Sequence, residues 1–138
     1  MSCPYFWPAE PRPGASPRHV MLPLGDLWSG RCIAGDQHFT PDAPTLHRLC
    51  NLGYARGVCR HFPLTPDLPD AVRFTISSDA SGVVQLYYVI ERDHRPFAHG
   101  RLDYSAAQHS LCPGSVPGGP LARQAEAYAE SYQRRKES

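Results

Sequence analysis

The stretch AVRFTISSDASGVVQLYYVIE, residues 71–91, decides the fold. Its two ends, 71–77 and 83–91, are rich in β-branched and aromatic residues, which favour strands. The intervening SDASG supplies small, turn-forming residues, so the whole stretch predicts an antiparallel hairpin. A second turn at RDHRP leads into FAHGRLDY, residues 97–104, which predicts a weaker third strand. We therefore expect an antiparallel meander of three strands.

The residues that follow this sheet predict a C-terminal helix. In LARQAEAYAESYQRRKE, residues 121–137, apolar side chains recur at helical spacing and form one stripe: Leu121, Ala125, Tyr128 and Tyr132. The basic residues at its end compensate the negative pole of the helix dipole. A meander and such a helix together predict an α+β fold in which the helix covers one face of the sheet.

The part of the chain before the sheet predicts little regular structure. Residues 1–40 are rich in proline and glycine with scattered aromatics, and they read as wrapped coil. The next segment, TPDAPTLHRLCNLG (40–53), predicts a helix with Thr40 as its N-cap and Gly53 at its end. Within it, Cys50 falls on the same side as the apolar Leu46 and Leu49.

The length of 138 residues favours a single domain. We expect that domain to span residues 1–138, with a metal-binding loop and helix region over 1–66. The antiparallel sheet takes 67–110 and the C-terminal helix takes 119–138.

Composition narrows the class of protein. A net charge of +1 gives no global field for nucleic acid or a membrane surface, so nucleic-acid binding is disfavoured. No stretch approaches the ~18 apolar residues that span a bilayer, and the first 20 residues do not have the pattern of a signal peptide. We therefore expect a cytoplasmic protein, in which a group of cysteines more often binds metal than forms disulfides.

Four of the five cysteines lie in the first 59 residues, with the spacing C-x28-C-x17-C-x8-C: Cys3, Cys32, Cys50 and Cys59. Four thiolates are what a [4Fe–4S] cluster or a structural zinc requires. Zinc sites usually take ligands in pairs from tight turns, and this chain has no such pair. The wide spacing favours the cluster, whose corners can be reached from separate segments.

The cysteines could also bind no metal and fill the core as small apolar side chains. If a metal is bound, two alternatives to this ligand set remain open. If the metal is zinc, a histidine from His38, His47 or His61 could replace one cysteine. If it is a cluster, Cys112 could replace Cys3, because each of these two cysteines precedes a proline, as the last ligand of the bacterial ferredoxin run does.

The residues around the cysteines suit a negatively charged cluster, which needs N–H donors and positive charge nearby. Gly53 and Gly57 permit a close approach of the backbone. Three arginines lie within three residues of a cysteine: Arg31, Arg56 and Arg60. Aromatic side chains that could exclude water from the cluster are Tyr5, Phe6, Trp7, Trp28, Tyr54 and Phe62.

No catalytic motif is present: the chain has no H-E-x-x-H, nucleophile elbow or phosphate loop. Cys59 and His61 are two residues apart, a spacing that rarely aligns a nucleophile with its base. We therefore expect an accessory or electron-transfer protein rather than an enzyme. The favoured function is electron transfer or redox sensing with a protein redox or regulatory partner. The alternative is a protein-interaction module stapled by a structural zinc or structural cluster.

Overall fold

The structure is a computed structural model, and it describes residues 1–11, 22–34, 38–52, 58–63, 68–112 and 119–137. Within these ranges, six strands form two antiparallel sheets of two and four strands, accompanied by helices. The class is α+β, as predicted. Among the described residues, no helix is both long enough and apolar enough to cross a membrane.

The larger sheet is built on the predicted hairpin. β3 (Ala71–Ala80), β4 (Val83–Arg92) and β5 (Arg95–Ser105) pair in chain order. Both connections are two-residue turns with positive φ at each residue: 57° at Ser81 and 77° at Gly82, then 53° at Asp93 and 61° at His94. This backbone geometry matches the right-handed twist of the flanking strands, which is why such short turns close a hairpin.

The predicted three-stranded meander is wrong. A fourth strand, β6 (Ser110–Leu111), pairs with the end of β5 in a segment that reads as loop. A second sheet is formed by β1 (Phe6–Pro11) and β2 (Trp28–Cys32), in the region that reads as wrapped coil. A strand of two residues is too short to leave a pattern of alternation in the sequence.

Prolines conceal β1, because they are rare in strands and cannot donate to a ladder. In a two-stranded sheet both strands are edges, where proline is tolerated. Pro8 pairs with Gly30, and a bulge follows between Pro8 and Glu10. At Gly30 a Cβ would collide with the carbonyl oxygen of Trp7, so only glycine permits this close pairing.

The predicted helix over 40–53 is shorter and less regular than expected. One α-helical turn, α1 (Ala43–Thr45), continues into a π-helical segment, η2 (Leu46–Cys50). Asp42, not Thr40, is the N-cap: its side chain accepts a hydrogen bond of 2.9 Å from the Thr45 amide. The predicted end at Gly53 lies outside the described residues.

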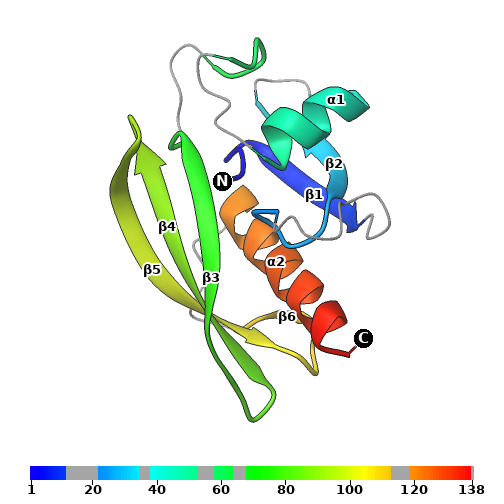
Figure 1. The fold of residues 1–138 in the computed structure, drawn as a ribbon, viewed down its shortest axis with the longest axis vertical. Coiled ribbons are helices and arrows are strands. Elements are labelled where there is room, and N and C mark those ends of the chain that lie inside the picture. The colour runs from blue at the N-terminus through cyan, green and yellow to red at the C-terminus, as the bar shows by residue number, and fades with distance from the viewer. Residues whose placement is uncertain (12–21, 35–37, 53–57, 64–67, 113–118, 138) are drawn as a thin grey trace.

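The long helix α2 (Gly119–Glu137) agrees with the predicted C-terminal helix and lies between the two sheets (Figure 1). Three alanines on α2 are fully buried, at 125, 127 and 129. The inward side chains of the larger sheet pack against α2, where the rings of Phe74 and Tyr128 lie 5.7 Å apart. One hydrophobic core therefore contains residues of both sheets and of α2. The single domain over residues 1–138 stays a prediction.

Candidate metal centre

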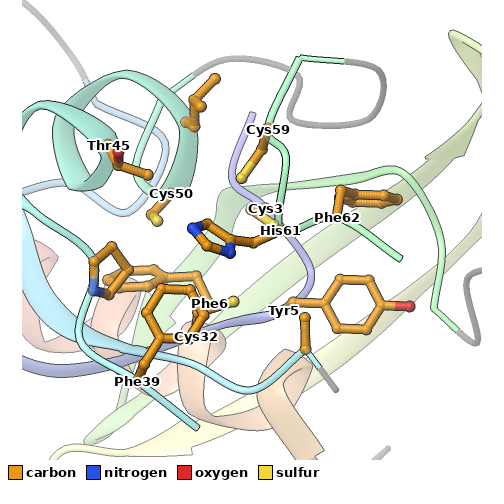
Figure 2. Close-up of a pocket in the computed structure, with 13 residues that line it drawn as sticks. Cys3, Tyr5, Phe6, Cys32, Phe39, Thr45, Cys50, Cys59, His61 and Phe62 are labelled. Carbon is orange, nitrogen blue, oxygen red and sulfur yellow. The ribbon is translucent and has the colours of Figure 1, made fainter. Parts of the chain in front are cut away.

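The four cysteines of the first 59 residues line one pocket. Cys3 precedes β1, Cys32 ends β2, Cys50 ends η2, and Cys59 lies in the segment before β3. Figure 2 shows their side chains around the same region, although up to 56 residues of chain separate them. Each sulfur thus comes from a different structural segment.

Backbone hydrogen bonds connect these cysteine segments directly. The Cys3 amide donates to the Cys50 carbonyl at 3.1 Å, which joins the chain start to the end of η2. Cys32 exchanges two bonds with Phe39, its amide donating at 2.8 Å and its carbonyl accepting at 3.2 Å. The Ile33 amide donates to Tyr5 at 2.9 Å. The pocket is therefore framed by backbone contacts.

Asn51 holds the segment of Cys50 against the strand of Cys32. Its side chain is fully buried, accepts from the Trp28 amide at 2.9 Å and donates to the Trp28 carbonyl at 2.8 Å. The same side-chain amide donates to the Leu46 carbonyl at 2.8 Å. Because Leu46 begins η2 and Trp28 begins β2, one side chain fixes the position of both elements.

Gln124 of α2 holds the segment of Cys3 in a similar way. Its buried side chain donates to the carbonyls of Cys3 at 2.7 Å and of Phe6 at 2.8 Å. Its oxygen accepts from the Ser2 hydroxyl at 2.7 Å. Neither Gln124 nor Asn51 is predicted from the sequence. The only sequence features that could have indicated them are positional: Gln124 is a polar residue next to Ala125 of the apolar helix stripe, and Asn51 directly follows Cys50.

The remaining pocket wall is apolar and aromatic. The lining includes Tyr5, Phe6 and Phe62 of the six aromatics predicted to screen the site, together with Phe39 and Leu49. Trp7 and Trp28 are not in the lining, and Tyr54 lies outside the described residues. The empty space among the lining side chains is about 350 Å³ including its open side. The part that the centre of a water molecule can occupy is only about 20 Å³.

Burial disfavours negative charge on these sulfurs. Desolvation, with added repulsion from Cys32 and Cys59, raises the pKa of Cys3 to about 12. Burial also raises the pKa of Cys50 and of Cys32. Reactive cysteines need a lowered pKa, so these three thiols are poor nucleophiles. Thiolates become stable in such a place when a cation is bound to them.

The side chains do not converge on a single point. Among the described residues, no three His, Cys, Asp or Glu side chains are placed to hold one metal ion. Of the histidines considered as zinc ligands, His61 lines the pocket, whereas His38 and His47 are exposed and are not in its lining.

The predicted neighbours of the cysteines are only partly described. Arg31 is exposed and adjoins Cys32 on β2, where successive side chains point to opposite faces, so it does not face the pocket. Arg60 is exposed, and its Nε donates to His61 Nε2 at 3.4 Å. Gly53, Arg56 and Gly57 lie outside the described residues.

Cys112 lies apart from the other cysteines. It follows β6, is partly buried, and its amide donates to the Asp103 carbonyl at 2.8 Å. It does not belong to the pocket lining, whereas Cys3 does. The geometry thus groups Cys3, rather than Cys112, with the other three.

One side of the pocket opens into a wider outer cleft. The lining of the cleft shares Cys59, His61, Phe39 and Leu49 with the pocket. The volume of the cleft that the centres of water molecules can occupy is about 590 Å³. Cys59 is partly exposed, whereas the other three pocket cysteines are buried at 6–8% exposure. Cys59 is therefore the most exposed of the four pocket cysteines.

Comparison of the chain with family models, curated proteins and solved structures finds no match.

Proposed function

We propose that the protein binds one [4Fe–4S] cluster through Cys3, Cys32, Cys50 and Cys59 and serves electron transfer or redox sensing. The observation that carries the proposal is that these four cysteines line one pocket although they come from four separate segments. Free cysteines also pack in cores as small apolar residues, but four of them around one pocket match the number of ligands that a cluster requires.

The chemistry of the pocket favours a cluster over a single ion. A [4Fe–4S] cluster takes each thiolate on a different iron, so its ligands need not converge on one point. Zinc requires four donors within about 2.3 Å of one centre, and the described side chains have no such arrangement. Apolar and aromatic walls would limit access of water, which tunes the potential of a cluster.

Binding requires the pocket to widen, because the space between the side chains is small. The direction for widening is the open side, where Cys59 and His61 border the outer cleft. The other three segments are tied by the bonds of Cys3, Asn51 and Gln124, so they stay in place.

The outer cleft also supports a role in electron exchange with a protein partner. Electrons would enter or leave beside Cys59, the least buried ligand, and the neighbouring Val58 is 69% exposed. This role is that of an accessory protein rather than an enzyme. A cytoplasmic location suits it, because thiols stay reduced there and all five cysteines are free.

The test is elemental analysis of protein purified without oxygen. We expect brown protein with about four irons and four sulfides per chain and little zinc. Cys32→Ala and Cys50→Ala should each abolish the colour, and Cys112→Ala is the matched control that should keep it. Colourless protein with one zinc would favour a structural zinc. Loss of colour in Cys112→Ala but not in Cys3→Ala would show that the fourth ligand is Cys112.

A redox titration then separates the two roles of a bound cluster. An electron-transfer or sensing cluster should be reduced and reoxidised reversibly without a change in far-ultraviolet circular dichroism. A cluster with no accessible couple would support the alternative, a structural staple of a protein-interaction module.

A further inference from the structure

Cys3 and Cys50 are direct neighbours within the cysteine pocket. The Cys3 amide donates to the Cys50 carbonyl at 3.1 Å, and among the hydrogen bonds of the described residues only this one joins two of the four pocket cysteines. Even along a straight path through this bond, standard bond lengths keep the two Cα atoms within about 7 Å, and the bends of the path shorten that distance. Disulfides usually join Cα atoms about 4.4–6.8 Å apart, so the backbone spacing suits one.

The side chains of Cys3 and Cys50 point into the same space. Both line the pocket (Figure 2), in which the centre of a water molecule can occupy only about 20 Å³. Burial, followed by repulsion from Cys3, raises the pKa of Cys50. Repulsion of this kind requires the two sulfurs to lie close together.

Other hydrogen bonds hold the two backbone segments in this position. The Gln124 side chain donates to the Cys3 carbonyl at 2.7 Å. Asn51, which directly follows Cys50, bonds to the amide and the carbonyl of Trp28. A bond between the two sulfurs therefore needs rotation of the side chains rather than movement of the backbone.

We infer that Cys3 and Cys50 form a reversible disulfide when the pocket holds no cluster and hydrogen peroxide is present. A disulfide carries no charge, so it suits a pocket whose burial disfavours thiolates. Exchange with small thiols reverses it. The bond takes two of the four ligands, so the oxidised chain cannot hold the cluster. This consequence rests on the proposed function, whereas the disulfide itself does not.

Cys59 is the entry point for the oxidant. It is the most exposed of the four pocket cysteines and borders the outer cleft, whereas Cys3 and Cys50 are buried. Burial, with repulsion from Cys32 and Cys59, raises the pKa of Cys3 to about 12, so Cys59 also lies near Cys3. An oxidised Cys59 can therefore pass its oxidation inward.

The reaction takes three steps. The Cys59 sulfur attacks one oxygen of hydrogen peroxide, the O–O bond breaks, and water leaves, which gives a sulfenic acid. The Cys3 sulfur attacks the Cys59 sulfur, an S–S bond forms, and the hydroxyl leaves with the Cys3 proton as a second water. The Cys50 sulfur then displaces Cys59 from Cys3, and its proton passes to the Cys59 sulfur. In sum, Cys3 and Cys50 lose two electrons and two protons, and one peroxide becomes two waters.

The test is mass spectrometry of the full chain after reduction, removal of metal with a chelator and treatment with hydrogen peroxide. Free thiols are alkylated before digestion with trypsin. The four pocket cysteines fall in four different tryptic peptides, because the chain carries Arg31, Arg48, Arg56 and Arg60 between or beside them. We expect a linked pair of peptides that contains Cys3 and Cys50, with three of the five cysteines alkylated. Dithiothreitol should remove the link.

Three variants test the route. Cys50→Ser should trap the intermediate link between Cys3 and Cys59. Cys59→Ser should slow the Cys3–Cys50 link several-fold without preventing it. Cys112→Ser is the matched control, because Cys112 lies outside the pocket lining, and it should form the link at the native rate. Circular dichroism should show that every variant is folded.

The disulfide is refuted if all five cysteines stay free after peroxide, if the main link joins another pair or two chains, or if Cys112→Ser slows the link as much as Cys59→Ser. Brown protein purified without oxygen tests the consequence for the cluster. Peroxide should bleach it and produce the same link, and bleaching with five free thiols would overturn this consequence. If no brown protein is obtained, the proposed function fails, and the link in the metal-free chain still decides the disulfide.

Discussion

Replacement of Gln124 by methionine should destabilise the fold more than the same change elsewhere on α2. Methionine is similar in length but cannot donate or accept the three hydrogen bonds of 2.7–2.8 Å that Gln124 makes. Two of the partners have another bond available: the single Ser2 hydroxyl proton can turn to the Val72 carbonyl, 3.2 Å from Oγ, and the Cys3 carbonyl also accepts from the Phe6 amide at 3.1 Å. These two partners lose only part of their hydrogen bonding.

The Phe6 carbonyl loses more. The amides of Phe6 and of its partner Cys32 both donate outside the ladder, to Cys3 and to Phe39. The pair is therefore non-hydrogen-bonded, and the Phe6 carbonyl points away from β2 toward Gln124. An unsatisfied buried carbonyl costs about 1–3 kcal/mol, and each weakened partner adds about 0.5–1.5 kcal/mol. We expect Gln124→Met to lower the free energy of unfolding by about 2–6 kcal/mol.

Urea unfolding followed by circular dichroism measures this loss, and Gln133→Met is the matched control on the partly exposed side of the same helix. Gln124→Glu separates hydrogen bonding from packing. Its carboxylate faces two carbonyl oxygens, so its pKa in the folded state should rise, and its stability should fall as the pH increases from about 5 to about 7. A loss below about 1 kcal/mol for Gln124→Met, or an equal loss for Gln133→Met, would refute the assigned role of Gln124.

Three further predictions concern single polar groups. Asn51→Ala should lower the free energy of unfolding by about 2–4 kcal/mol in urea unfolding, because the buried Trp28 amide and carbonyl both lose their partner; a loss under about 1 kcal/mol would contradict this. Tyr104→Phe should raise the free energy of unfolding by about 1 kcal/mol, since the buried hydroxyl has no hydrogen-bond partner among the described residues; a loss of stability would show that it has one. Hydrogen bonds from Lys136 and Tyr132 lower the pKa of Asp79, so this carboxylate stabilises the fold above its ordinary pKa of 3.8 and less as the pH falls through the lowered pKa. Asp79→Asn should therefore be less stable than the native chain at about pH 7 but not at about pH 2, and an equal difference at both would argue against the interaction.

Part of the fold is readable from local pattern alone. The strands of the 71–91 hairpin and the helix at the C-terminus follow from periodicity and turn residues, which act over a few neighbouring positions. Pairing of β1 with β2 is not readable in this way. The prolines of β1 disfavour a strand by propensity, but they are tolerated because both strands of this sheet are edge strands. Gly30 lets β2 approach the backbone of β1 closely.

The candidate metal centre was likewise predictable from the sequence only in part. The number of cysteines and their wide spacing predicted a four-cysteine group, with Cys112 left open as an alternative to Cys3. Only the tertiary structure places the four in one pocket, with Cys59 at its open side. It also brings Gln124, 121 residues away along the chain, to the Cys3 carbonyl. Such a contact leaves no periodic trace in the sequence, because a hydrogen bond depends on position in space and not on separation along the chain.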